Sequence, residues 1–288
     1  ALVLLATGAL LGFLISWSNA HGRSALADGF YLAHTTTMLL GFVGTTVLGT
    51  LTVLWPTMLR TPMEPVAPRW TTRGLPYLVG GTALVAACGL WPPLAGLGTL
   101  VYLGGVCAVL VPAYRTARRV PPTSFATASA TASVAWFIGC VAVLGARMAL
   151  ADDAAAAREV IHSLRLPLAA GFALQILVAA LSYLTPVMLG GGPAATRATN
   201  AIMDRCAAYR VTAANACLLL ALSPGVPWQV RVVAGALAAL VTSYLLVGMI
   251  LSLRELSRRK RTPRTPTDAA PTSDPADRRS AQPRRGTR

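Results

Sequence analysis

The sequence predicts an all-α, polytopic membrane protein, a bundle of about eight transmembrane helices followed by a disordered basic tail. Hydrophobic residues make up 55% of the chain and charged residues only 12%, about half the charge of a soluble globular domain. Apolar runs also recur from residue 1 to residue 253. A helix of about 20 residues spans a hydrocarbon core of ~30 Å, so each run is long enough to cross a bilayer.

The eight expected helices cover residues 1–17, 31–55, 75–92, 97–113, 128–150, 166–189, 208–224 and 228–253. We interpret the first as a helix and not as the core of a signal peptide, because no basic segment precedes it. Pro92 and Pro93 fit a tight turn between two helices better than a helix interior. The runs form one membrane domain, residues 1–253, in which no convincing internal repeat is visible.

The basic residues predict how this domain is oriented. With the tail in the cytoplasm and eight helices alternating, 20 of the 25 basic residues fall in inner loops or in the tail. The five exceptions are Arg23, Arg147, Arg158, Arg165 and Arg231. Inner loops of membrane proteins are enriched in Lys and Arg. We therefore expect a multi-pass protein of the cell membrane with both termini in the cytoplasm.

Residues 254–288 form the predicted tail, which is rich in Pro, Thr, Asp and Arg and has no apolar period. Such a segment buries too little apolar surface to fold, so we expect it to be disordered. Residues 258–261 are all basic and serve as an orientation signal that can lie on anionic lipid head groups. No aromatic residues are interleaved with the basic ones, so nucleic acid is not an expected partner despite the net charge of +15.

His34 is the first candidate ligand, about one turn into the second run. It shares a helical face with Met38, Gly41, Thr45 and Gly49. A neutral imidazole there can bind haem iron or copper, and the small residues leave room for a flat macrocycle. The alternative is a packing stripe, since small residues at this spacing bring membrane helices together.

The other two histidines also fall toward the predicted outer face. His162 lies in a segment that Asp152 or Asp153 can cap as a short helix, before Pro167 breaks the entry to the next run. His162 either reaches over the same pocket as His34 or lies exposed on an amphipathic turn. His21, in the first outer loop, is the weakest candidate metal ligand, and a solvated loop residue is its alternative.

Two polar side chains are candidates for cofactor binding. Gln175 shares a stripe with Gly171, Ala179 and Ser182 in the sixth run. In mid-membrane its amide needs a hydrogen-bond partner, from a neighbouring helix, a haem propionate or a quinone. Arg147, near an outer helix end, either pairs with a haem propionate or extends to the lipid head groups.

Several other kinds of site are not indicated by the sequence. The five cysteines occur singly, so neither a zinc knuckle nor an iron–sulfur cluster is expected. No Asp or Glu lies deep within a predicted helix, which counts against a proton-coupled transporter. No G-x-x-x-x-G-K-[ST] loop is present to indicate an ATPase.

Two stretches carry a family resemblance, HTTTMLLGFVGTTVLGTLTVLWPTMLRT at 34–61 and LSYLTPVMLGGGP at 181–193. They resemble the membrane region of actinobacterial copper oxidases and membrane-anchored copper nitrite reductase-like proteins, and more distantly haem–copper oxidase-like and NnrS-like membrane proteins. The resemblance implies that His34 is a metal or haem ligand and that 190–193 is a structural turn. Leu32 stands where the family pattern has a further histidine, and no His-Cys-Met copper set follows the last run.

We therefore expect an integral membrane redox or metal-handling protein, with haem b or copper bound near the outer leaflet by His34 and His162. It would transfer electrons between quinone and an outer-face cupredoxin or copper enzyme, or handle copper or nitric oxide. Two alternatives stay open. One is a non-redox transporter, which a Gly- or Pro-broken helix in each of two related halves would support. The other is a structural subunit that docks an outer copper protein.

Overall fold

A computed structural model describes residues 1–261, and within this range the chain is helical with no β-strand. The predicted all-α class is therefore confirmed. The last helix continues to Arg261, past the boundary predicted at residue 253. The rest of the predicted tail, 262–288, lies outside the described residues.

The elements share one helical layout and differ mainly in length. In chain order they are α1 (Leu2–Ala20), α2 (Ser24–Thr36), η1 (Thr37–Gly44), α3 (Thr45–Met58), α4 (Ala67–Ala86), η2 (Ala87–Gly89), α5 (Pro93–Arg119), α6 (Phe125–Ala149), α7 (Ala154–Ser163), η3 (Pro167–Leu174), α8 (Gln175–Leu189), α9 (Gly192–Met203), α10 (Ala207–Leu222) and α11 (Trp228–Arg261). Here η1 and η3 are π-helical, and η2 is a short 3₁₀ turn.

Every predicted run coincides with a helix or with an unbroken series of helices. Among the described residues, six helical stretches are long and apolar enough to cross a membrane: Leu2–Ala20, Ser24–Met58, Pro93–Arg119, Phe125–Ala149, Pro167–Leu189 and Trp228–Arg259. This supports a multi-pass membrane protein. The other two predicted spans correspond to α4, which begins with an Arg-containing segment, and to α10, which has only 16 residues. Crossing of the bilayer by these two helices stays a prediction.

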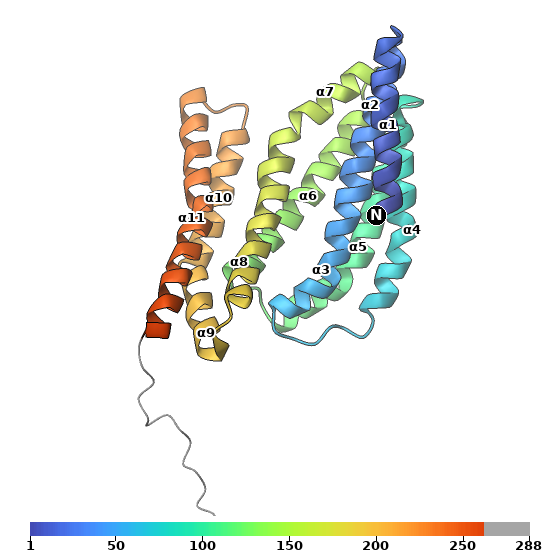
Figure 1. Cartoon of the computed structure of the whole chain (residues 1–288). Coiled ribbons are helices and arrows are strands. Elements are labelled where there is room, and N and C mark those ends of the chain that lie inside the picture. The colour runs from blue at the N-terminus through green and yellow to red at the C-terminus, as the bar shows by residue number, and fades with distance from the viewer. Residues whose placement is uncertain (262–288) are drawn as a thin grey trace, which may run out of the picture.

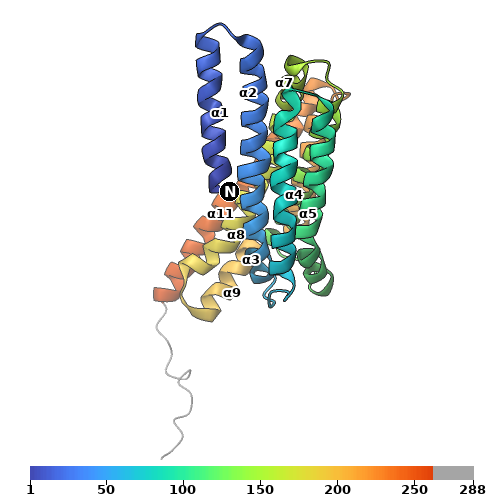
Figure 2. The same ribbon diagram turned by 90° about the vertical axis from the view of Figure 1, so that its right-hand side faces the viewer.

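The helices run up and down in a single bundle, and their connections gather at its two ends (Figure 1). The 59–66 loop, α9 and the end of α11 lie at one end, which we call the basic end. The α1–α2 turn and α7 lie at the other, which we call the opposite end, and the view turned by 90° agrees (Figure 2). All three histidines belong to helices or turns of the opposite half of the bundle. The chain thus separates its histidines from its basic loops, as the sequence predicts.

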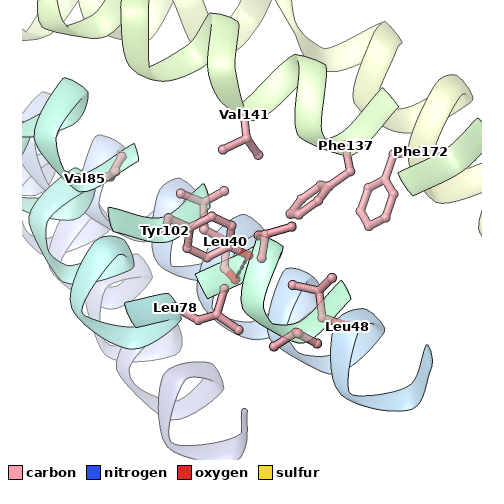
Figure 3. Close-up of a cluster of buried hydrophobic side chains, with 10 residues drawn as sticks. Leu40, Leu48, Leu78, Val85, Tyr102, Phe137, Val141 and Phe172 are labelled. Carbon is pink, nitrogen blue, oxygen red and sulfur yellow. Dashed lines mark hydrogen bonds between the residues drawn. The ribbon is translucent and has the colours of Figure 1, made fainter. Parts of the chain in front are cut away.

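The core joins the first helices of the chain to the later ones. Tyr102 of α5, Phe137 of α6 and Phe172 of η3 are almost completely buried and form a row of rings. The Phe137 and Phe172 centroids are 4.5 Å apart, and those of Tyr102 and Phe137 are 6.3 Å apart. Leu40 and Leu48 pack beside them (Figure 3). Aromatic pairs at these separations add to the packing energy of buried area alone.

In each π-helical segment, a backbone carbonyl accepts a hydrogen bond from a hydroxyl group of a neighbouring helix. The Tyr102 hydroxyl donates to the Leu40 carbonyl in η1 over 2.9 Å (Figure 3). The Ser133 hydroxyl of α6 donates to the Phe172 carbonyl in η3, also over 2.9 Å. A π-helical segment disturbs the regular i→i−4 pairing of a helix, and these hydroxyl donors satisfy backbone acceptors where that pairing changes.

The two π-helical segments also reveal an internal repeat. Aligning Thr37–Gly44 with Pro167–Leu174 pairs Gly41-Phe42 with Gly171-Phe172. The same offset pairs the start of α2 with the start of α7, and LWPTML at 54–59 with LTPVML at 184–189. The first half, 1–119, and the second half, 125–261, therefore contain the same order of long helices. Our interpretation of the sequence, which found no convincing internal repeat, was therefore wrong.

Candidate functional site

His34 lies in the contact between α1 and α2. Its Nδ1 is 2.7 Å from the Gly8 carbonyl oxygen of α1. Because a carbonyl only accepts hydrogen bonds, the Nδ1 atom must carry the proton. In the neutral imidazole the Nε2 atom then keeps its lone pair. This is the tautomer of an imidazole that binds a metal through Nε2 while its other nitrogen donates to the protein.

Glycines of α1 allow this close approach. A Cβ atom built on Gly12 would lie 3.2 Å from the Cε1 and Nδ1 atoms of the His34 ring, and one on Gly8 would collide with the Met38 sulfur. On the α2–η1 side, a Cβ on Gly41 would lie 3.1 Å from Thr82 of α4. Gly41 of the predicted stripe therefore packs closely against a neighbouring helix, whereas a Cβ on Gly49 would meet nothing within 4 Å.

His162 occupies a different contact, between α2 and α7. Asp153 caps α7 by accepting from the Ala156 amide over 2.7 Å, which confirms the predicted cap. The His162 ring stacks on Tyr31, with centroids 5.9 Å apart and planes at 6°. Arg158 crosses the same contact, 2.8 Å from Asp28 and 4.3 Å from the Tyr31 ring centre. This cluster holds α7 across the opposite end of the bundle.

The structure assigns His34 and His162 to separate neighbours. The His34 ring bonds to α1, whereas the Nε2 atom of His162 faces the Arg158 guanidinium at 3.5 Å. His21 is exposed, and its Nδ1 lies 2.8 Å from the Trp17 carbonyl of its own helix. Over residues 1–261, no three His, Cys, Asp or Glu side chains form a group able to hold a metal ion.

Gln175 finds its partner on α10. Its Nε2 donates to Asn215 Oδ1 over 2.8 Å, and the Trp136 indole of α6 donates to the same oxygen over 2.7 Å. The Asn215 amide in turn donates to the Val211 carbonyl over 2.8 Å. Of the partners expected for Gln175, the structure therefore shows the neighbouring helix. Sequence analysis overlooked Asn215, although a lone amide within an apolar run is the same signal that identified Gln175.

An apolar cleft of about 430 Å³ opens beside this network, between the η3–α8 stretch and α10 and α11. Gln175 lines it together with Leu174, Leu218, Trp228 and Arg231. Arg147 is not part of the cleft, and its guanidinium donates to Ser163 of α7 over 3.0 Å. Arg147 therefore ties α6 to α7, and Gln175 is the predicted cofactor-binding residue that borders open space.

Comparison with protein-family models, with curated proteins and with solved structures finds no match to this chain.

Proposed function

We propose that this chain is an integral membrane redox or metal-handling protein in which His34 binds a b-type haem or a copper ion. The hydrogen bond from His34 Nδ1 to the Gly8 carbonyl is the observation that supports the proposal. It fixes the ring orientation and leaves the Nε2 atom of the neutral ring as the possible ligand atom. A bound haem or copper ion would supply one-electron chemistry.

The surroundings of Gln175 support a quinone as the partner of this protein. The cleft beside it is almost wholly apolar, and Arg231 and Trp228 belong to its lining. An isoprenoid tail suits apolar walls, and a quinone carbonyl accepts from an amide donor. We propose a cupredoxin or copper enzyme as the electron partner outside the membrane, at the end of the bundle that carries α7.

The proposed topology has eight crossings, with α4 and α10 spanning the bilayer beside the six longer helical stretches. Each packs antiparallel along its neighbour in the bundle, α4 along α5 and α10 along α11 (Figures 1 and 2). The basic end then faces the cytoplasm of the cell membrane, by the positive-inside rule.

A spectrum of the full chain purified in detergent tests the redox proposal. Expression with haem and copper supplied should yield either a reduced α band of b type or stoichiometric copper. His34→Ala and His34→Gln should both lose it, while His21→Ala retains it. Gln is the matched variant because its amide can still donate to the Gly8 carbonyl. A colourless wild-type protein without stoichiometric iron or copper would refute the proposal.

Transport is a second candidate, favoured by the internal repeat. Helices broken at corresponding positions of two halves line substrate sites in many transporters, and here each half carries a π-helical segment at the corresponding place. Substrate-dependent flux into proteoliposomes, with no bound chromophore, would select this function over electron transfer.

A further inference from the structure

A polar cavity of about 290 Å³ lies at the basic end, where the two halves of the chain meet. Four separate segments line it: the end of α3, the α5–α6 connection, α8 and α9. The lining residues that carry polar side chains are Arg60, Thr123, Ser124, Thr127, Ser182, Tyr183, Asn200 and Asp204. Eight polar side chains therefore surround one cavity, which a ligand or water can occupy.

Ser182 gives the first independent sign of a ligand. The residue is only 3% exposed, and its Oγ has no hydrogen-bond partner anywhere in the described part of the chain. Serines in membrane helices usually donate to the carbonyl one turn earlier, as Thr185 does to Leu181 over 2.7 Å. A buried hydroxyl without a partner is unfavourable. Ser182 borders the cavity, so a ligand there would supply the missing partner.

Arg60 gives the second sign, from its backbone. Arg60 directly follows the LWPTML motif and has φ of 53°, in the left-handed region that disfavours side chains. Gly190 holds the equivalent position after LTPVML, also with positive φ, 64°. The second half of the repeat thus has a glycine at this positive-φ position, and the first half keeps a long cationic side chain there, beside the cavity. Strain retained at a site lined by polar groups is typical of ligand binding.

Two further donors border the cavity, and one of them, on the exposed Arg60, is near enough to Asp204 to oppose the rise in the pKa of that carboxyl group. Among residues 1–259, no side chain or carbonyl accepts a hydrogen bond from the Arg60 guanidinium or the Asn200 amide. Arg60, Ser182 and Asn200 come from three segments of the chain, the 59–66 loop, α8 and α9. A phosphate group presents its oxygens tetrahedrally and can meet donors that come from different segments, whereas the two oxygens of a carboxylate lie in one plane. Guanidinium groups also pair well with phosphate.

Asp204 also lines the cavity, and its carboxyl group indicates which kind of group the phosphate is bonded to. Its Oδ1 already accepts from the Phe125 amide over 2.8 Å, and burial raises the pKa of this carboxyl group above its usual range. The second oxygen is an acceptor suited to a ligand hydroxyl. We propose that this cavity binds a phosphate bonded to a small hydroxylated group, as in a soluble glycerol phosphate or the head group of phosphatidylglycerol. This inference does not rest on the function proposed for His34.

Calorimetric titration of the full chain with sn-glycerol 3-phosphate tests the site, in phosphate-free detergent at fixed ionic strength. Ser182→Ala should weaken binding about 5- to 10-fold, and Arg60→Gln about 10- to 100-fold. Arg69→Gln removes the same charge from an exposed position of α4 at the basic end, and it should bind as the wild type does. Succinate should bind at least 10-fold more weakly than the phosphate ester.

A second arm distinguishes the two sources of the phosphate. In nanodiscs that contain phosphatidylglycerol, loss of the calorimetric signal together with retained lipid in native mass spectra assigns the site to the head group. An unchanged signal assigns it to a soluble ester. Either result supports the site. Absence of both glycerol phosphate binding and retained phosphatidylglycerol, equal weakening by Arg69→Gln, or tighter binding of succinate would overturn it.

Discussion

Gln175 and Asn215 bond to each other across α8 and α10, and Asn215 Oδ1 is the acceptor that Gln175 shares with Trp136. Three helices therefore depend on a single oxygen atom. In a lipid-facing bundle no water replaces a lost partner, so the cost of a substitution depends on which of these side chains it removes.

We predict that Asn215→Leu destabilises the protein more than Gln175→Leu does. The first leaves the Gln175 and Trp136 donors without an acceptor, for a cost of about 2 kcal/mol. The second leaves Asn215 its Trp136 and Val211 partners, for a cost of about 1 kcal/mol. The double variant should cost less than the sum of the two single variants, because the groups act as one network. Unfolding in mixed detergent micelles measures all three. Additive losses would mean that the network is not coupled.

The bond between His34 and Gly8 gives a prediction about the docking of α1. His34→Ala should lower the free energy of unfolding by about 1 kcal/mol and expose α1 to proteolysis, because interhelical hydrogen bonds in membranes have about this strength. His34→Gln should restore most of the loss. His21→Ala is the matched control, since that ring is exposed and contacts only its own helix and turn. Equal effects of the Ala and Gln variants would point to ring packing as the main contribution.

How far the sequence predicts this structure depends on the range of the interaction concerned. Apolar length places all eight helices, and the Asp153 cap and the Pro92 turn follow from local chemistry. Partners on other helices are different: neither Gly8 for His34 nor Asn215 for Gln175 follows from the pattern of a single run. The repeat was hidden because lipid-facing positions exchange one apolar residue for another. The cavity at Arg60 requires four distant segments to be placed together, which no local motif specifies.

Asp204 predicts a specific pH dependence of stability. Burial raises its pKa in the folded protein, while its hydrogen bond with the Phe125 amide and the nearby Arg60 and Arg210 oppose the rise. Since the folded-state pKa exceeds the unfolded one, the contribution to stability is fully present below the usual Asp pKa and is lost as the pH rises through the folded-state value. Asp204→Asn keeps an acceptor for the Phe125 amide and should abolish this component.

The comparison of wild type and Asp204→Asn therefore uses the difference between their unfolding free energies across the acidic range. The wild type should gain stability relative to the variant as the pH falls through the folded-state pKa. A difference that stays flat, or that changes in the opposite direction, would show that the carboxylate is favoured by its neighbours in the folded protein and that desolvation is the smaller effect.

Arg60→Gly separates the backbone strain at the basic end from the charge of the side chain. Glycine adopts φ of 53° without a steric penalty, and the second half of the repeat has a glycine, Gly190, at the corresponding positive-φ position. We expect the variant to gain about 1 kcal/mol in the free energy of unfolding while it loses phosphate binding. Arg60→Gln keeps the strained backbone and removes the charge, so it should lose binding without gaining stability. Thermal unfolding and calorimetric titration of both variants distinguish the two contributions. A destabilised Arg60→Gly protein would mean that the side chain supports the fold, and the Arg60 strain would then no longer argue for a ligand.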